Sequence, residues 1–326
     1  MYETLFNLVE INNLVQHYNI VHPYQITGNR VTDINFLQNF STQKKILITA
    51  DTDPYSAESY EYWLSLGNDF PNRIKVLTSD LNKFFHEGEL IYFPTWMLNQ
   101  LLQKNYQTTN KPFRFSFLSS QSRFHRLYFF QKVKQYITDT DCFSVYATNY
   151  INQSSFVNDD SIKYLGQVED LTKDIPYFSS ASNDRIEEYF ESITVQQSLQ
   201  FTNEHNAFSA MINVTGESNI RDDFVFLSEK TWKPIQSQCL FFTLGNIDSA
   251  KLLTKLGFSL FDENNQSLTL LDKISYISTL MRDWDLDMCK QLYKNNIDLV
   301  EHNHDRLYSN ELKQLFKLYL QERLEL

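Results

Sequence analysis

The fold is decided by the stretch Asp222–Gly257, DDFVFLSEKTWKPIQSQCLFFTLGNIDSAKLLTKLG. Within it, the apolar run Leu240–Leu244 predicts a buried strand, because a short apolar run between polar residues is typical of strands inside a sheet. A helix is predicted next, with Asp248 as its N-cap and Gly257 in the left-handed position that ends many helices. A strand that leads into a helix favours a parallel α/β sheet.

The same alternation of strands and helices occurs toward the N-terminus. Three strands are predicted, at Lys44–Ala50, Ile74–Thr78 and Leu90–Phe93. Between the first two, Ala57–Leu66 has the apolar spacing of a helix. The polar segment Lys104–Lys111 (KNYQTTNK) then predicts a linker. We therefore expect an N-terminal α/β domain that spans residues 1–108.

A second domain is expected from residue 109 to residue 308. Its predicted elements are strands at Phe113–Leu118, Ala210–Val214, Phe224–Leu227, Leu240–Leu244 and Phe258–Phe261, and helices at Leu127–Ile137, Leu268–Met281 and Leu286–Leu299. A last helix is predicted at Asn310–Leu324, within residues 309–326, and we expect it to return to the first domain. The length of 326 residues favours two domains, and one large α/β domain is the alternative.

Composition indicates a folded protein that stays in the cytosol. Hydrophobic residues form 42% of the chain and aromatic residues 15%, which is enough apolar surface for packed cores. No apolar run reaches the ~20 residues that cross a bilayer, and the start MYETLFNLVEINN lacks the features of a signal peptide. The three cysteines have no CxxC spacing, so we expect reduced thiols without catalytic chemistry.

Charge and glycine spacing argue against several classes of function. The net charge of −11 disfavours tight general binding of nucleic acid, although the basic residues between Arg123 and Lys134 are compatible with a local basic groove. The chain has only seven glycines and no GxGxxG or GxxxxGK[ST] motif. The sequence therefore gives no motif support for a kinase, a P-loop NTPase or an NAD-dependent dehydrogenase.

The segment Phe226–Gly245 resembles the donor-binding motif of the α1,3-fucosyltransferases and of related phage-encoded glycosyltransferases. The shared features are an apolar pair, then Ser228, then Glu229 and Lys230, a short helix, and an apolar strand that ends in glycine. The resemblance implies that Glu229 accepts hydrogen bonds from the nucleotide ribose and that Lys230 meets the diphosphate. It also implies a GT-B fold, in which two Rossmann-like domains with parallel sheets face a central cleft.

The chemistry of sugar transfer agrees with a cation at this place. Negative charge grows on the departing diphosphate as the glycosidic bond breaks, and without a metal it is stabilised by Lys, Arg and helix N-termini. Pro234 refines the prediction, because proline is tolerated in the first turn of a helix but not deeper. We therefore expect Thr231 rather than Ser228 to be the N-cap, so that Lys230 lies just before the helix and faces the ligand.

Two further segments resemble parts of the same families. Phe113–Tyr136 is similar to the strand, loop and helix that open the donor domain, and the resemblance places Arg126, or alternatively Arg123, on the diphosphate. Ile212–Ser218 is similar to the strand and Glu-containing loop before the Glu-Lys motif, which makes Glu217 a candidate for contact with the base or ribose.

The predicted donor site combines these segments. Trp232 is either a core residue or a platform on which the base stacks. The site then comprises Ser228, Glu229, Lys230, Thr231, Trp232, Glu217, Arg123 and Arg126, with Lys230 and Arg126 stabilising the departing diphosphate.

The pair Asp51 and Asp53 follows the predicted strand Lys44–Ala50 and has three interpretations. Such a pair is suited to hold a divalent metal on a sugar diphosphate, as in GT-A enzymes, or to supply a phosphatase nucleophile. It is also compatible with a plain polar turn. On the acceptor side, Asp51, Asp53 or Glu58 would act as the general base of an inverting transfer. Because only one clear strand precedes the pair, we predict no metal site.

These features predict a metal-independent glycosyltransferase that needs no cofactor and takes its sugar from a GDP- or UDP-linked donor. The acceptor hydroxyl belongs to a glycan or, given the phage relatives, to a hydroxymethylated DNA base, in which case the protein acts in the host cytoplasm. Inversion is implied only by the fucosyltransferase resemblance. A second alternative is a non-catalytic module that binds a nucleotide or a sugar.

Overall fold

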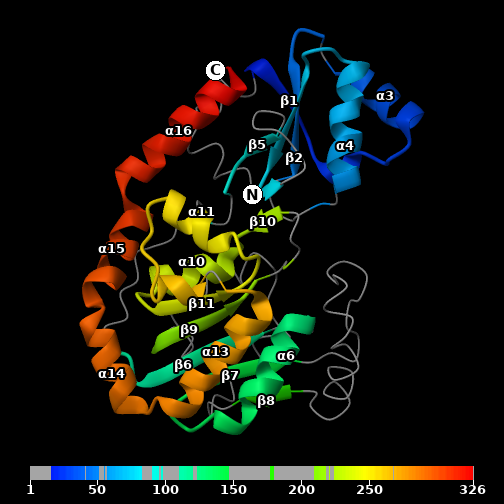
Figure 1. The fold of residues 1–326 in the computed structure, drawn as a ribbon. Coiled ribbons are helices and arrows are strands. Elements are labelled where there is room, and N and C mark those ends of the chain that lie inside the picture. The colour runs from blue at the N-terminus through cyan, green and yellow to red at the C-terminus, as the bar shows by residue number, and fades with distance from the viewer. Residues whose placement is uncertain are drawn as a thin grey trace. The chain divides into compact units, whose positions relative to one another are not determined.

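The structure is a computed structural model, which describes residues 16–40, 42–50, 55, 57–82, 90–94, 97, 110–119, 123–146, 177–179, 209–217, 220, 224–266 and 268–325. The chain divides into two compact units, of which the first comprises Met1–Leu102 and Ser309–Leu326 and the second Gln103–Tyr308. Each unit contains its own sheet of mainly parallel strands together with helices, so the fold is α/β, as predicted (Figure 1). The predicted boundary after residue 108 falls outside the described residues.

The first unit is built on a four-stranded parallel sheet in the order β1-β2-β3-β5. Its elements are β1 Tyr18–Val21, the 3-10 turn η1 Pro23–Gln25, α3 Arg30–Gln38, β2 Lys45–Ala50, α4 Ala57–Ser65, the 3-10 turn η2 Leu66–Asn68, β3 Ile74–Thr78, β4 Asp80–Asn82, β5 Leu90–Tyr92 and α16 Asn310–Leu324. Ile46, Ile48 and Val76 form a core without exposed surface. The C-terminal helix α16 is held in this unit by the Tyr18 hydroxyl, which donates to Leu324 O at 2.8 Å.

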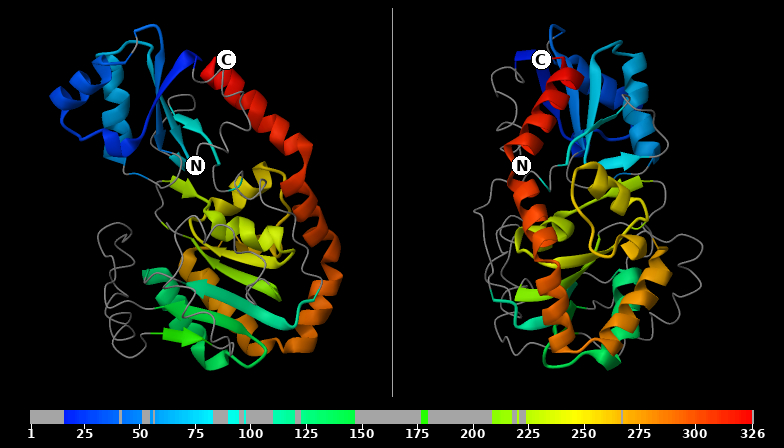
Figure 2. Two further views of the ribbon diagram at one scale, coloured as in Figure 1. Left: turned by 180° about the vertical axis from the view of Figure 1, so that it is seen from behind. Right: turned by 60° about the vertical axis from the view of Figure 1, so that its left-hand side comes forward.

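The second unit is built on a five-stranded sheet in the order β11-β9-β6-β7-β8, seen from two further sides in Figure 2. Strand β8 runs antiparallel to β7, and the other neighbours are parallel. The elements are β6 Phe113–Ser119, α6 Phe124–Val133, the 3-10 turn η3 Lys134–Tyr136, β7 Cys142–Tyr146, β8 Tyr177–Ser179, β9 Ala210–Gly216, β10 Phe224–Phe226, α10 Glu229–Gln236, β11 Leu240–Leu244, α11 Ser249–Lys255, α12 Glu263–Gln266, α13 Leu270–Asp283, α14 Leu286–Asn295 and α15 Ile297–Tyr308.

The two faces of this second sheet differ in polarity, because side chains alternate between faces along a strand. On the apolar face, the ring of Phe117 packs on Phe129 of α6, with 4.9 Å between ring centroids. Phe242 on the same face packs on Tyr276 of α13, with 6.1 Å between centroids. The opposite face carries buried polar side chains, namely Ser116, Asn213, Thr215 and Thr243. The helix α10 lies against β9 on this polar face.

Several predicted elements are confirmed. The run Ile74–Thr78 is β3 and the run Leu240–Leu244 is β11, residue for residue. The last predicted helix, Asn310–Leu324, coincides with α16. Among the residues described, no helix combines the length and the apolar character that crossing a bilayer requires.

Two predictions about secondary structure are wrong. Phe258–Phe261 forms no strand, because the backbone of Ser259 pairs with a side chain instead of another strand. Ser259 N donates to Asn303 Oδ1, and Asn303 Nδ2 donates to Ser259 O, both at 2.8 Å. The predicted single helix Leu286–Leu299 is two helices, α14 and α15, because Asn296 ends α14 as its C-cap.

Candidate functional site

The candidate site lies at the carboxyl ends of β6 and β9 in the second unit. The chain passes from β6 to β7 on one side, and the later strand β9 lies on the other side of β6. The strand order therefore reverses between β6 and β9. In open α/β sheets, ligands bind beyond the carboxyl ends of the strands at such a reversal. The predicted residues Arg126 and Glu217 follow these two strands along the chain.

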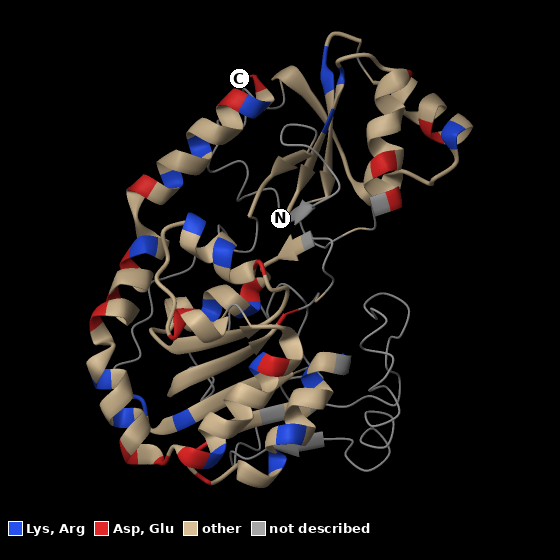
Figure 3. Cartoon of the chain, in the orientation of Figure 1, with Lys and Arg blue, Asp and Glu red and all other residues tan. Residues whose placement is uncertain are grey.

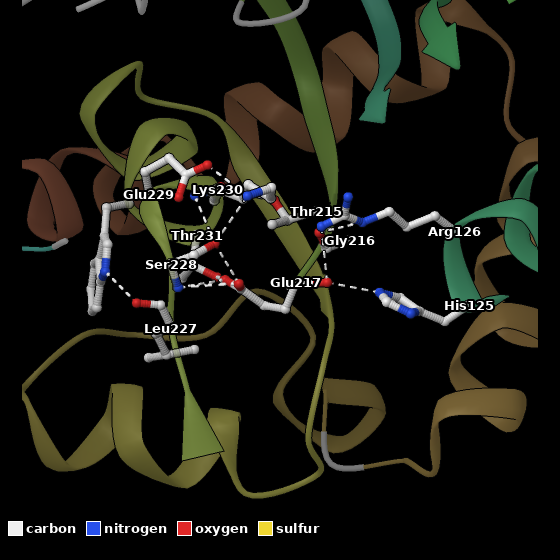
Figure 4. A network of polar contacts seen from close by, with 11 residues as sticks. His125, Arg126, Thr215, Gly216, Glu217, Leu227, Ser228, Glu229, Lys230 and Thr231 are labelled. Atoms are coloured by element: carbon white, nitrogen blue, oxygen red, sulfur yellow. Dashed lines mark hydrogen bonds and ion pairs between the residues drawn. The ribbon is translucent and has the colours of Figure 1, made fainter. Parts of the chain in front are cut away.

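The backbone at the end of β9 is bound to the first turn of α6. Arg126 Nε donates to Gly216 O at 3.0 Å, and Arg126 Nη2 donates to Glu217 O at 3.1 Å. His125 Nε2 lies 2.8 Å from the same Glu217 O. Because a carbonyl oxygen can only accept, His125 carries a proton on Nε2. Figure 4 shows both side chains pointing at the backbone of Gly216 and Glu217.

The carboxylate of Glu217 is bound to the first turn of α10. Its oxygens accept hydrogen bonds from Ser228 N at 3.1 and 3.2 Å, from Ser228 Oγ at 2.6 Å and from Thr231 Oγ1 at 2.5 Å. The side chain has no exposed surface. Glu217 therefore joins the starts of α6 and α10, and its inward orientation does not support the predicted direct contact with ribose or base.

The N-cap of α10 is Ser228, so the prediction of Thr231 is wrong. Ser228 has extended backbone angles, and its hydroxyl accepts a hydrogen bond from Lys230 N at 3.3 Å. Pro234 is tolerated inside the helix because another group compensates for its missing N–H, which would have donated to the carbonyl of Lys230. The hydroxyl of Thr215 lies 3.2 Å from that carbonyl oxygen. Lys230 consequently belongs to the first turn of the helix and does not precede it.

Both signs of charge meet at the start of α10 (Figure 3). Lys230 Nζ lies 2.6 Å from Glu229 Oε1, and the two side chains are 25% and 17% exposed. Burial raises the pKa of Glu229, but Lys230 and Lys233 outweigh it and hold that pKa at about 2. Burial lowers the pKa of Lys233 to about 8 against the opposing effect of Glu229. The start of α10 thus holds an ionised carboxylate and two amino groups within reach of solvent.

Arg126 is a buried cation with an unused donor. Its side chain is 1% exposed, and burial lowers its pKa to about 10, an effect that Arg123 reinforces and that Glu217 and Glu229 oppose. The guanidinium therefore stays charged at neutral pH. Its Nε and Nη2 are hydrogen-bonded, whereas Nη1 has no hydrogen-bond partner within the described part of the chain. A donor left over on a charged guanidinium suits an anion, because charge-assisted hydrogen bonds are strong.

His125 lies beside Arg126 and is neutral. Burial lowers its pKa well below the usual value, and the nearby charges of Arg126, Arg123 and Lys230 lower it further. The influence of Lys230 on His125 places the starts of α6 and α10 in one electrostatic environment. Because the imidazole of His125 is neutral, it adds no further positive charge beside Arg126, Arg123 and Lys230.

The helix α6 begins without a side-chain cap. Arg123 occupies the N-cap position, and its side chain makes no capping hydrogen bond. The first amide groups of a helix have no partner within the helix, and together with the helix dipole they attract anions. Arg123 and Arg126 therefore both lie in the part of α6 that favours a phosphate group, one as N-cap and the other in the first turn.

The remaining predicted residues have different positions. Trp232 has no exposed surface, its Nε1 donates to Leu227 O at 3.3 Å, and its ring packs on Phe258. A ring without exposed surface cannot stack on a base, so Trp232 is a core residue. Asp51 and Asp53 lie outside the described residues, and the alternative base Glu58 is exposed in α4.

The sequence did not predict three residues of the site, namely His125, Thr215 and Gly216. Thr215 and Asn213 are polar residues at alternate positions of an otherwise apolar strand, which is the signal that could have identified them. Gly216 is required by close packing, since a Cβ atom there would lie 2.8 Å from Arg126 Cγ. A glycine at the end of a strand is a weak signal of such an approach.

Comparison with known protein families, with curated proteins and with solved structures found no match. The structure itself defines an α/β protein with two mainly parallel sheets, compatible with a two-domain Rossmann-like fold. Within the described ranges, no group of three His, Cys, Asp or Glu side chains is arranged to hold a metal ion.

Proposed function

We propose that this chain is a metal-independent glycosyltransferase of the GT-B type, which moves a sugar from a nucleoside-diphosphate donor to an acceptor hydroxyl. One observation carries the proposal. The buried Glu217 joins the cationic starts of α6 and α10 at the reversal of strand order, and Arg126 Nη1 lacks a partner among the described residues. This arrangement suits a ligand with two neighbouring phosphate groups.

The residues present supply the electrostatics that such a transfer needs. The departing diphosphate gains negative charge, and fixed donors stabilise that charge without reorganising. Arg126 is fixed by its two hydrogen bonds to the β9 end and offers Nη1. Lys230 would exchange its ion pair with Glu229 for the diphosphate. Glu229, with its pKa near 2, stays ionised and would accept hydrogen bonds from ribose hydroxyl groups.

The acceptor side is assigned to the first unit. An inverting transfer needs a general base that removes the proton of the acceptor hydroxyl. Asp51, Asp53 and Glu58 follow the carboxyl end of β2 along the chain, which is the end where α/β sheets place their ligands. We propose that one of these carboxylates is the base.

The donor site is tested by thermal unfolding with GDP, UDP, ADP and CMP, each with and without Mg²⁺ or Mn²⁺. We expect one nucleoside diphosphate to raise Tm without metal and the rise to disappear in Lys230→Ala. Lys251→Ala is the matched control, because Lys251 is 77% exposed and pairs only with Asp248 among the described residues. No shift with any nucleotide, or a shift that requires metal and persists in Lys230→Ala, would overturn the proposal.

Catalysis is tested separately from binding. The nucleotide that binds is supplied as its sugar conjugate together with glycan acceptors or hydroxymethylated duplex DNA, and the released nucleoside diphosphate is measured. Release that depends on a glycan supports the proposal as stated, whereas release that depends on DNA and declines steeply with salt identifies the DNA-modifying alternative. Binding without any release with these acceptors favours the non-catalytic module.

A further inference from the structure

A chain of buried polar side chains crosses the second sheet from β6 to α10. Asn213 Nδ2 lies 2.8 Å from Ser116 Oγ, and Thr215 Oγ1 lies 2.8 Å from Asn213 Oδ1. Thr215 Oγ1 also lies 3.2 Å from Lys230 O, at the start of α10. The three side chains are at most 4% exposed. Buried polar groups in a sheet core are costly unless each is satisfied, so this chain fixes the structures that it joins.

The end of the chain compensates for Pro234. In an α-helix the carbonyl of residue 230 accepts from the amide of residue 234, and proline has no amide hydrogen. The carbonyl of Lys230 would therefore be left without its helical partner in the first turn of α10. The hydroxyl of Thr215 lies 3.2 Å from this carbonyl oxygen. One hydroxyl on β9 thus replaces one backbone hydrogen bond of the helix that carries Lys230.

The number of available protons constrains the direction of these hydrogen bonds. The hydroxyl of Thr215 has one proton but faces two acceptors if Asn213 presents Oδ1 to it. The oxygen and nitrogen of an Asn amide are interchangeable in shape, so the amide orientation is decided by its partners. If the amide of Asn213 is turned over, Ser116 donates to Asn213, Asn213 donates to Thr215, and Thr215 donates to Lys230 O. Each of the two hydroxyl groups then donates one hydrogen bond.

We propose that Thr215 is a positioning residue of the donor site. By holding the Lys230 carbonyl, its hydroxyl sets the first turn of α10, and with it the direction of the Lys230 side chain and of the helix amides that would meet the diphosphate. This inference rests on the proposed function, because it assigns a role within the same site. Thr215 itself is 4% exposed and acts through Lys230.

The test is a double-mutant cycle between Thr215 and Pro234, read out by unfolding and by calorimetric binding of GDP, UDP and ADP. Thr215→Val removes the donor and keeps the shape, and we expect it to weaken nucleotide binding about 10-fold. Pro234→Ala restores an amide hydrogen for the Lys230 carbonyl, so Thr215→Val/Pro234→Ala should bind within about 3-fold of wild type. Thr215→Ser keeps the hydroxyl and should also bind like wild type.

Thr243→Val is the matched control. Thr243 is the in-register neighbour of Thr215 on β11, is equally buried, and its hydroxyl makes no hydrogen bond within the described part of the chain. We expect this control to leave nucleotide affinity unchanged.

The outcomes separate the two proposals. Weaker binding in Thr215→Val that Pro234→Ala restores supports the positioning role. Unchanged binding in Thr215→Val, or a loss that Pro234→Ala does not restore, overturns it, even if wild type binds nucleotide well. If wild type binds none of GDP, UDP and ADP, the proposed function fails and the positioning role fails with it, whatever the unfolding cycle gives.

Discussion

The carboxylate of Glu217 accepts both the amide and the hydroxyl of Ser228, at 3.1 and 2.6 Å from one of its oxygens. Glu217 directly follows β9 and Ser228 is the N-cap of α10, so this pair fixes the start of a helix to the carboxyl end of a central strand. The same residue accepts hydrogen bonds from α6 through its carbonyl. Glu217 is therefore the point through which the two helix starts are held together.

Replacing Glu217 with Gln tests this bracing role. The amide group of Gln would face Ser228 N, Ser228 Oγ or Thr231 Oγ1, which all donate to Glu217 in the wild type. We expect the free energy of unfolding in urea to fall by about 2–4 kcal/mol, because hydrogen bonds to a buried charged group are lost and a donor is left without an acceptor. Glu263→Gln, at an exposed position of α12, should stay within about 0.5 kcal/mol. Equal stability of the two variants would contradict the bracing role.

Gly216→Ala tests the packing between β9 and α6. The added Cβ would lie 2.8 Å from Arg126 Cγ, and the guanidinium beyond it is already held by Gly216 O and Glu217 O. We expect a loss of about 1–3 kcal/mol in stability from overpacking, together with weaker nucleotide binding as Arg126 shifts. The control is Gly67→Ala, where nothing lies within 4 Å of the new atom. A Gly216→Ala protein that matches this control in stability and binding would show that the close approach is unimportant.

The fold was predicted well where local sequence decides it. Short apolar runs between polar residues identify β2, β3 and β11, because a buried strand needs little more than that pattern. The strands β1 and β7 were missed, since YNIV and CFSVY mix polar with apolar residues. Phe258–Phe261 has a strand-like pattern, but its polar partner is the side chain of Asn303, which lies 44 residues away from Ser259 in the sequence and is invisible to local reasoning.

The site was predicted in part. Glu229, Lys230, Arg126 and Glu217 were identified, and the structure gathers them at one edge of a sheet. The sequence could not show that Glu217 turns inward, because its partners Ser228 and Thr231 become neighbours only after β9 and α10 pack. The N-cap was misplaced for the same reason. Local rules disfavour Pro234 beyond the first turn, and the tertiary contact with Thr215 supplies the hydrogen bond that proline cannot donate.

Asn303→Leu tests whether one side chain replaces a strand partner. Asn303 is 3% exposed and satisfies both backbone groups of Ser259. Leucine has nearly the same size but leaves that amide and that carbonyl unpaired, so we expect unfolding free energy to fall by about 2–4 kcal/mol. Asn295→Leu, at the end of α14, makes a smaller change, because its only described partner is the side chain of Gln291. A loss in Asn303→Leu no larger than in this control would contradict the assignment.

On the side of β11 away from β9, two backbone carbonyl groups accept hydrogen bonds from side chains. Gln266 Nε2 donates to Phe241 O at 2.6 Å, and Lys273 Nζ donates to Thr243 O at 3.0 Å. In the described sheet, β11 is an edge strand with β9 as its neighbour. An unprotected edge invites pairing with another chain, and the two side chains occupy the acceptors that such pairing would use. Lys273 is buried in this position, with 1% of its surface exposed.

Lys273→Met tests the cost of that burial through pH. Burial lowers the pKa of Lys273 from 10.5 to about 8, so between these values the unfolded chain binds a proton that the folded protein does not. The free energy of unfolding should therefore rise as pH increases through this window. Below pH 8, keeping the buried amino group protonated costs up to about 3 kcal/mol, and this cost disappears near pH 10.5. Methionine keeps the volume without the charge, and groups such as Lys233 titrate in both proteins and cancel in the difference. We expect the unfolding free energy of wild type minus that of Lys273→Met, measured in urea at pH 7, 8, 9 and 10, to change little from pH 7 to 8 and to increase from pH 8 to 10. A difference that is constant over this range would show that the buried amino group does not titrate as proposed.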